Sequence, residues 1–350
     1  MIEKKLTCCS LCGANADLMD NKRPGYQEPD TFKIYQCSYC NTSFALPRVE
    51  TIAIYESIYK NGCAVPGYGR YWQYMKAVKN SKAPLEYLSK SEDIYWSVQQ
   101  ALKRLVKEKS STRILEVGSG LGYLTYSLNM AGYNATGLDI SQTAVTKANT
   151  FFGNFYIFGD LFEHAVLHSS EYDLVIFTEV IEHIDDPLPF IKSILKMVKP
   201  GGNAIITTPN KSIFPRDIVW KTENPPVHWW WFSEESIKFI AEKNNVKFEL
   251  IDFSPFYRKN YKSIDLIKYR AEQPQKPTLG SSGEVLVFND GQSILLRHLR
   301  LFLSKIPVIK SLLISIKNYI QRIKEASNPD IIIFNKRGNV LCAILKKDLW

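Results

Sequence analysis

Arg113-Ile-Leu-Glu-Val-Gly-Ser-Gly-Leu-Gly122 is the stretch that decides the fold of this 350-residue chain. A short apolar run ends in an acid and is followed by glycines at alternate positions. Because glycine has no Cβ, the backbone can turn sharply there and pass close to a ligand. The helix expected from about Tyr123 points its free N–H groups at the same place. The pattern therefore predicts a strand, a ligand-binding turn and a helix.

The elements that follow come in the order of a nucleoside-binding α/β unit. Strands are expected at 134–138, 155–158, 172–177, 204–208 and 246–253, and helices at 143–151, 187–198 and 234–244. Asp139 ends the second strand, where an acid can accept both hydroxyls of a ribose. Asp160 follows the third strand, where it can accept a hydrogen bond from an exocyclic amine. The fourth strand is apolar enough to be central in a parallel sheet.

Together with Lys199-Pro-Gly-Gly202, these motifs make residues 92–255 resemble the class I S-adenosylmethionine-dependent methyltransferases. The resemblance implies an α/β, Rossmann-like, doubly wound and mostly parallel seven-stranded sheet with a C-terminal antiparallel strand. It also implies S-adenosylmethionine as the cofactor, bound by Glu116, Gly118, Gly120, Asp139, Ile140, Asp160, Leu161 and Thr178. Among these, Glu116 and the two glycines would cradle the methionine portion, and Asp160 with Leu161 would frame the adenine. A nicotinamide dinucleotide site shares the glycine turn, but the acid before the glycines suits a phosphate-free ligand that carries an amine.

Glu179-Val-Ile-Glu182-His183 follows the fourth strand, at the edge of the sheet where ligands of doubly wound folds gather. Three roles stay open: His183 as a general base, the side chains as ligands of a divalent cation such as magnesium, or a purely structural turn. The small-RNA 3′-end 2′-O-methyltransferases and the ubiquinone-pathway O-methyltransferases resemble this chain at Glu-x-x-Glu-His and use the motif for a magnesium-type ion. In the RNA family a further histidine completes the site, and this chain offers His228.

Two Cys-x-x-Cys pairs precede the methyltransferase-like part of the chain. Cys9 and Cys12, and then Cys37 and Cys40, are each followed by a residue that favours a tight turn. Four thiolates at this spacing are typical of a closed, structural zinc ribbon with no open position for a substrate. The residues between the pairs show no basic face that would indicate binding to nucleic acid.

Five parts are predicted: a zinc-ribbon lobe at 1–50, a tyrosine-rich linker or lid at 51–91, the methyltransferase core at 92–255, a linker with a basic helical insertion at 256–328, and a β-hairpin at 329–350 that closes the core. Within the insertion, 270–282 has the composition of an open linker. Residues 295–324 combine a basic face with apolar positions, which suits either a covering helical hairpin or contact with an anionic membrane surface. Trp229, Trp230 and Trp231 could stack on a substrate or only pack at the start of a helix.

The chain has 45% hydrophobic residues and a net charge of +9, which is typical of a globular protein, and its start lacks an apolar signal region. The expected location is the cytoplasm, with peripheral membrane contact as an alternative. The function predicted from the sequence is O-methylation of a small polar metabolite or of a sugar destined for surface glycans. The alternatives are an RNA 2′-O-methyltransferase, although nucleic acid is not favoured, and a non-catalytic adaptor that binds the cofactor.

Overall fold

The computed structural model describes residues 7–286, 316 and 318–349 of the chain. In this described part, seven strands form the main sheet in the order β11-β14-β9-β8-β5-β6-β7. The strands β5 to β9 pair in parallel, and β14 lies antiparallel between β9 and β11. Their bounds are β5 (Arg113–Val117), β6 (Asn134–Asp139), β7 (Tyr156–Phe158), β8 (Tyr172–Thr178), β9 (Val198–Pro209), β11 (Lys247–Leu250) and β14 (Val340–Lys346). The predicted Rossmann-like fold with its antiparallel C-terminal strand is confirmed.

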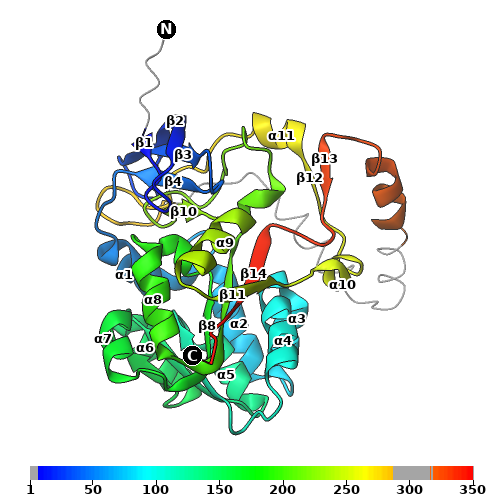
Figure 1. The fold of residues 1–350 in the computed structure, drawn as a ribbon. Helices are drawn as coiled ribbons and strands as arrows, with labels where there is room; N and C mark the ends of the chain where they lie inside the picture. The colour runs from blue at the N-terminus through cyan, green and yellow to red at the C-terminus, as the bar shows by residue number, and fades with distance from the viewer. Residues whose placement is uncertain (1–6, 287–315, 317, 350) are drawn as a thin grey trace. The chain divides into compact units, whose positions relative to one another are not determined.

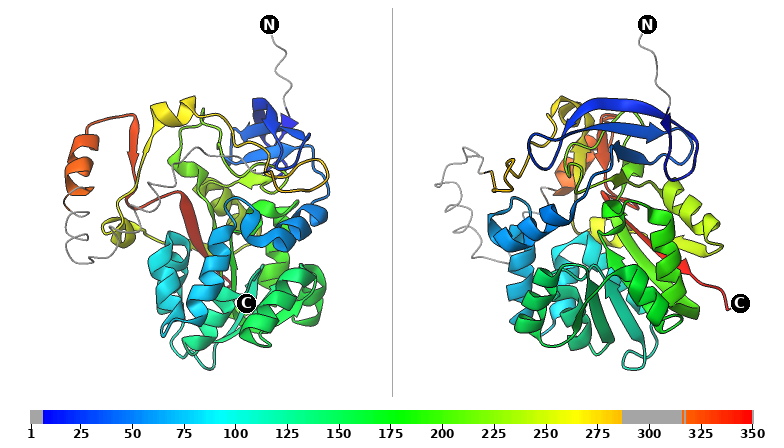
Figure 2. Two further views of the ribbon diagram at one scale, coloured as in Figure 1. Left: turned by 180° about the vertical axis from the view of Figure 1, so that it is seen from behind. Right: turned by 90° about the vertical axis from the view of Figure 1, so that its left-hand side faces the viewer.

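Helices cover both faces of this sheet (Figure 2). They are α4 (Asp93–Leu105), α5 (Tyr123–Met130), α6 (Gln142–Phe152), α7 (Leu161–Leu167), α8 (Pro187–Met197) and α9 (Glu234–Lys243). The start of α9 has the expected cap, because Ser233 and Ser236 exchange side-chain and backbone hydrogen bonds. Short turns, η2 (Ile181–His183) and η3 (Lys211–Ile213), follow β8 and β9 at their carboxyl ends. Both turns therefore lie at the edge of the sheet where a ligand is expected.

A second, five-stranded sheet carries the cysteine pairs. It consists of β1 (Thr7–Cys8), β2 (Asn15–Pro24), β3 (Thr31–Cys37), β4 (Ser43–Leu46) and β10 (Trp230–Trp231), in that order. Figure 1 shows β10, which comes from the middle of the chain, beside the N-terminal strands. The cysteine lobe (residues 7–46) thus takes one strand from the methyltransferase-like part and is not a separate appendage.

The tyrosine-rich segment forms α1 (Ile52–Asn61), η1 (Gly62–Ala64), α2 (Gly69–Lys79) and α3 (Pro84–Ser91). Ile54 and Ile58 of α1 and Val65, which follows η1, pack in one cluster with Tyr26 of the cysteine lobe, Val227 and Leu279. Leu279 belongs to the segment that composition indicated as an open linker, and that expectation is wrong. Leu279 is fully buried, and the N–H groups of Thr278 and Leu279 donate to the carbonyl of Tyr26 at 2.8 and 3.0 Å.

Residues 252–273 and the described residues within 286–337 form a second compact unit. In its described part it contains α10 (Ser254–Tyr257), β12 (Ser263–Asp265), α11 (Leu266–Ala271), a helix over 318–325 and β13 (Ile331–Ile333). The predicted hairpin at 329–350 does not form, because β13 pairs with β12 whereas β14 joins the main sheet. Most of the basic segment 295–324 lies outside the described residues. No helix among the residues described is long and apolar enough to span a bilayer.

Candidate functional site

The glycine turn after β5 brings the backbone against the end of β6. Gly118 and Gly120 have φ of +74° and +51°, values that side-chain-bearing residues rarely adopt. A Cβ on Gly118 would lie 2.5 Å from Cγ2 of Val180, so only glycine fits. The Gly120 N–H donates to Oδ2 of Asp139 at 2.6 Å. Asp139 therefore fixes the turn and also stands at the cofactor end of the site.

Burial controls the charge of the two acids at this end. Glu116 is 3% exposed and accepts a hydrogen bond from the hydroxyl of Thr125. Burial raises the pKa of Glu116 to about 8, and burial likewise raises the pKa of Asp139 above its ordinary value. A cationic ligand would offset this desolvation and favour the charged carboxylates. The acids are therefore suited to a ligand that brings an ammonium group and ribose hydroxyls.

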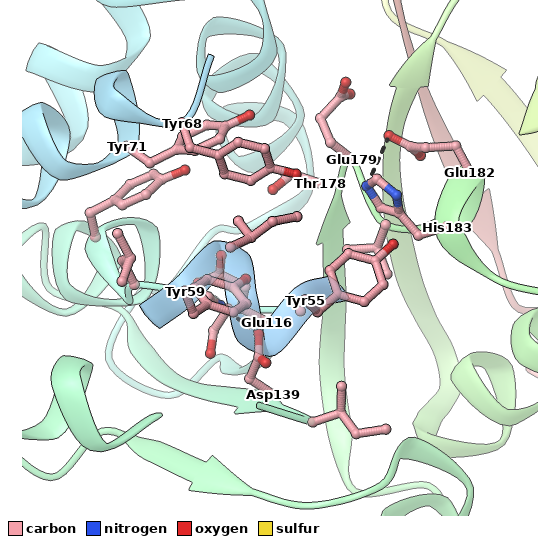
Figure 3. A pocket seen from close by; sticks show the side chains of 18 of the residues that line it. Tyr55, Tyr59, Tyr68, Tyr71, Glu116, Asp139, Thr178, Glu179, Glu182 and His183 are labelled. Atoms are coloured by element: carbon pink, nitrogen blue, oxygen red, sulfur yellow. Dashed lines mark hydrogen bonds and ion pairs between the residues drawn. The ribbon is translucent and has the colours of Figure 1, made fainter. Parts of the chain in front are cut away.

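A cavity of about 360 Å³ runs from this turn to the end of β8. Of the predicted cofactor residues, Glu116, Gly118, Gly120, Asp139, Ile140 and Thr178 line it. Figure 3 shows several of them, with Glu179, Glu182 and His183 at the far side. The cavity therefore connects the cofactor residues with the Glu-x-x-Glu-His motif.

Asp160 and Leu161 are not among the residues that line this cavity. Oδ1 of Asp160 instead accepts hydrogen bonds from the N–H groups of Phe162 and Glu163, at 2.7 and 3.1 Å, and so caps α7. Leu161 is 8% exposed at the start of the same helix. The assignment of these two residues to the adenine stays a prediction.

Glu182, His183 and His228 form a compact group at the far end of the cavity. Their ligand atoms all lie within 4.8 Å of one another, which would suit a metal ion. Oε1 of Glu182 lies 4.0 Å from Nε2 of His183, as the dashed line in Figure 3 marks. In the part of the chain that the structure describes, this Oε1 and Nδ1 of His228 are buried without a hydrogen-bond partner. Buried polar atoms are rarely left without a partner.

Hydrogen bonds fix the orientation of this group. Oε2 of Glu182 accepts from the hydroxyl of Thr208 at 2.9 Å. Nδ1 of His183 donates to the carbonyl of Val227, which leaves the lone pair of the neutral ring on Nε2. Burial lowers the pKa of His183, and burial together with His183 lowers the pKa of His228 well below its ordinary value. Burial raises the pKa of Glu182. A bound cation would offset the desolvation of the Glu182 carboxylate, and two neutral imidazoles lie beside it to act as further ligands. The group therefore suits a divalent ion.

Glu179 lies outside this three-residue group, although it lines the same cavity. It adopts φ of +53°, and its pKa is raised to about 8 by burial and by the neighbouring Glu223. Glu223 and Arg70 also line the cavity, and Oε2 of Glu223 lies 3.7 Å from Nδ1 of His228. No sequence motif marks Glu223, because it comes from a loop position far from the Glu-x-x-Glu-His segment.

The tyrosine-rich segment covers the cavity. Tyr55, Tyr59, Tyr68 and Tyr71 line it (Figure 3). The hydroxyl of Tyr55 donates to the carbonyl of Val227 at 3.1 Å. Glu56 anchors α1 by accepting hydrogen bonds from Ser141 and Thr143 at the start of α6, both at 2.8 Å. The segment thus both packs between parts of the fold and faces the ligand space, so each of the two roles considered for it has support.

The four predicted cysteine ligands lie together. The Sγ atoms of Cys9 and Cys40 are 3.8 Å apart, and those of Cys12 and Cys37 are 3.4 Å apart. A tetrahedral site with Zn–S bonds of about 2.3 Å has sulfur–sulfur edges of about 3.8 Å, so the arrangement of the four thiols suggests a zinc site. Gly13 and Asn41 follow the pairs with φ of +78° and +55°. The neighbouring Cys8 is exposed and lies outside the group.

The three tryptophans after His228 are not substrate platforms in this arrangement. Trp229, Trp230 and Trp231 are 0%, 0% and 2% exposed. The guanidinium of Arg48 lies 4.7 and 4.4 Å from the ring centroids of Trp229 and Trp230. The tryptophans therefore join the cysteine lobe to the end of the cavity, which agrees with the packing role.

Comparison with known proteins agrees with this geometry. Residues 92–250 match the family model described as a methyltransferase domain. Similar curated proteins include the ubiquinone biosynthesis O-methyltransferase of Hydrogenovibrio crunogenus, 37% identical over 105 residues, which are 28% of this chain and 43% of that protein. The Aliivibrio fischeri (strain MJ11) protein of the same name is 36% identical over 106 residues, 29% of this chain and 45% of its own length. The chain thus spans less than half the length of these relatives.

Solved structures with a similar arrangement include an S-adenosylmethionine-dependent methyltransferase from Archaeoglobus fulgidus, 16% identical with a TM-score of 0.38, covering 71% of this chain and 93% of that one. Another, from Thermotoga maritima, is 13% identical with a TM-score of 0.42 and covers 84% of this chain and 100% of that one. The family match, the seven-stranded sheet and the glycine turn beside Glu116 and Asp139 agree. Residues 92–250 are a class I S-adenosylmethionine-dependent methyltransferase domain.

Proposed function

We propose that the chain is an S-adenosylmethionine-dependent O-methyltransferase that acts on a small polar acceptor, such as a metabolite or a sugar precursor of surface glycans. The observation that carries this proposal is the single cavity with Glu116 and Asp139 at one end and Glu182, His183 and His228 at the other. A volume of about 360 Å³ beneath the tyrosine-rich segment favours a small acceptor over a folded RNA. The matched ubiquinone biosynthesis O-methyltransferases support oxygen as the acceptor atom.

The cofactor supplies an activated methyl group on its sulfonium sulfur. Glu116 is placed to hold the ammonium of its methionine portion, and Asp139 its ribose hydroxyls. The remaining space leads to Glu182, His183 and His228, where an acceptor hydroxyl would be oriented toward the methyl carbon. Holding the two reactants in line supplies much of the rate enhancement in such a transfer. The tyrosine-rich segment excludes water from this space.

A divalent ion is part of the proposal. Glu182, His183 and His228 would hold it, since their neutral imidazoles and carboxylate suit a cation and two of their buried polar atoms lack a partner in the described chain. Such an ion lowers the pKa of a hydroxyl that binds to it. Glu179 would not be a direct ligand in the present arrangement, because it lies outside the group. We also propose one structural zinc on Cys9, Cys12, Cys37 and Cys40.

His183 as a general base is the second candidate mechanism. The bond from Nδ1 to the carbonyl of Val227 leaves the lone pair of the neutral ring on Nε2, on the side of Glu182. That nitrogen could take the acceptor's proton directly. Loss of activity in His183→Ala with no effect of a chelator on the initial rate would favour this mechanism.

A methyl-transfer screen tests the proposed function. The purified protein is incubated with S-adenosylmethionine labelled in its methyl group and with nucleotide sugars, glycolipid precursors, catechols or total RNA. We expect label in a small hydroxyl-bearing acceptor, and none with Asp139→Ala. Label only in RNA would establish the RNA alternative. Tight binding of S-adenosylhomocysteine without turnover on any acceptor would favour the non-catalytic adaptor and contradict the proposal.

A further inference from the structure

Segment 227–233 lies between the cysteine lobe and the end of the cavity that holds Glu182, His183 and His228. These three residues are called the acceptor group, because the methyl acceptor is proposed to bind beside them. On the lobe side, Trp230 and Trp231 form β10 and pair with Phe44 and Ser43 of β4 (Figure 1). The N–H of Ala45 also donates to the carbonyl of Trp229 at 2.9 Å. The lobe therefore holds this segment by backbone hydrogen bonds, which fix its register.

On its other side, the same segment holds the acceptor group. The N–H of Trp229 donates to the carbonyl of Glu182 at 2.8 Å, and Nε1 of Trp230 donates to the carbonyl of Ile184 at 2.7 Å. The carbonyl of Val227 accepts the bond from Nδ1 of His183. His228 itself belongs to this stretch. All three residues of the acceptor group are thus either in the segment or bonded to it.

A further set of bonds leads directly to the second cysteine pair. The hydroxyls of Ser233 and Ser236 donate to the carbonyl of Cys40 at 2.8 and 3.1 Å. The guanidinium of Arg216 donates to the carbonyl of Cys37 at 3.0 Å. These carbonyls belong to the turn that a metal ion would close. The geometry of the turn is therefore connected to the segment over short distances.

Close packing leaves little room for the segment to relax by itself. Its three tryptophans are buried, and Phe32 and Phe44 of the lobe pack against them with ring centroids 5.7 and 5.8 Å apart. Protein interiors packed in this way transmit a displacement instead of absorbing it. A change in the cysteine turn is expected to move the segment, and with it His228 and the partners of Glu182 and His183.

We propose that the cysteine lobe positions the acceptor group through segment 227–233, so that loss of the metal from the cysteines disables methyl transfer while cofactor binding persists. This inference rests on the proposed function for the transfer step alone. Ser233, Ser236 and the backbone of Trp229 and Trp230 are positioning groups and do not touch the substrate. The zinc site would then both stabilise the cysteine lobe and keep the acceptor group in position.

The cofactor end is held by different contacts. The N–H of Gly118 donates to the carbonyl of Leu138 at 2.8 Å, and Asp139 accepts from the N–H groups of Gly120 and Ser141. Thr125 of α5 holds Glu116. These bonds lie within β5, β6 and the starts of their helices. Loss of metal from the cysteines is therefore expected to affect the acceptor end of the cavity and to leave the cofactor end unchanged.

Two variants of the full chain test it, each compared with the parent protein. Cys37→Ser removes one metal ligand. Ser236→Ala leaves the ligands intact but removes one of the two hydroxyl bonds to the Cys40 carbonyl, together with the bonds of Ser236 to the Thr42 hydroxyl and to the Ser233 N–H. Ser212→Ala is the matched control, because the Ser212 hydroxyl accepts from the N–H of Glu234 at 2.7 Å at the start of the same helix and has no hydrogen bond to the lobe among the residues that the structure describes. Metal content, hydrogen exchange by mass spectrometry, the affinity for S-adenosylhomocysteine, and kcat are measured for all four proteins.

In Cys37→Ser we expect faster amide exchange in 180–185 and 224–233, unchanged exchange in 113–123 and 134–141, and an affinity for S-adenosylhomocysteine within threefold of the parent. We expect kcat to fall about 100-fold, as for other misplaced reacting groups. Ser236→Ala should keep its zinc, show the same pattern of exchange more weakly, and lose kcat several-fold. Ser212→Ala should match the parent in exchange at 180–185 and in kcat.

Faster exchange confined to 7–46 in Cys37→Ser would overturn the inference, as would equal behaviour of Ser236→Ala and Ser212→Ala. An affinity for S-adenosylhomocysteine that falls together with kcat would also overturn it, since both ends of the cavity would then depend on the lobe. If no acceptor is methylated even by the parent, the proposed function fails, whereas the exchange data still decide whether the lobe positions the acceptor group.

Discussion

Replacing Asp139 by alanine is expected to weaken the binding of S-adenosylhomocysteine at least tenfold. The carboxylate stands at the end of β6 on the cavity wall and would accept the two ribose hydroxyls. Hydrogen bonds to a charged group contribute about 1.5 to 3 kcal/mol each, so losing two corresponds to roughly 100-fold or more before water takes their place. The variant also frees the N–H groups of Gly120 and Ser141, now bonded at 2.6 and 2.8 Å, and loosens the turn. Both effects weaken binding.

Calorimetric titration with S-adenosylhomocysteine measures this change, with thermal unfolding as a check on folding. Asp160→Ala is measured beside it, because it removes an aspartate that follows the next strand and whose side chain caps α7. If Asp160 frames the adenine as the sequence predicts, its loss also weakens the binding of S-adenosylhomocysteine. An affinity equal to that of the parent would leave Asp160 with the capping role alone. Equal affinity of Asp139→Ala and the parent, in a folded protein, would refute the ribose assignment.

Three further predictions follow from the site. Burial raises the pKa of Glu116 to about 8, and only the ionised carboxylate attracts the cofactor's ammonium. The affinity for S-adenosylhomocysteine should therefore fall at least tenfold when the pH is lowered from 8 to 6. A Glu116→Gln protein with the same pH profile would contradict this. Elemental analysis should find one zinc per chain, lost in Cys37→Ser; full retention in that variant would reject the four-cysteine site. A mild chelator that spares the thiolate site should abolish methyl transfer, and added magnesium or manganese should restore it. In Glu182→Ala, the added ion should not restore activity. Activity that changes neither with the chelator nor in Glu182→Ala would exclude the divalent-ion proposal.

The sequence was most informative where one local rule determined each element. The glycines after β5, the alternation of strands and helices from Arg113 to Pro209, and the serine cap before α9 each have a single physical cause. The cysteine spacing works in the same way, since a tetrahedral ion accepts few arrangements of four sulfurs. These features were predicted from the sequence, and the seven-stranded sheet agrees with them.

Features that depend on distant pairing could not be predicted in this way. The strand over 331–333 has the composition of a hairpin partner for β14, but it pairs with β12, some 70 positions earlier. The proline- and glycine-containing segment around Leu279 has the composition of a linker, yet it packs against Tyr26. Local composition does not encode which distant surface a segment meets.

The candidate site shows the same division. Glu182, His183 and His228 lie together, as the motif and the later histidine suggested, whereas Asp160 is not among the residues that line the cavity, and its place at the adenine stays a prediction. Glu223 enters the site through the tertiary fold. The position of β10 in the cysteine sheet could not be predicted from the sequence either, because a strand of two residues has no periodic pattern.

A crystal structure of the protein with S-adenosylhomocysteine would decide whether one cavity joins the cofactor to Glu182, His183 and His228. We expect the amino group at Glu116, the ribose at Asp139 and the sulfur facing the side of the cavity where Glu182 and His183 lie. A sulfur that faces away from this group, or a ligand bound outside the cavity, would contradict it.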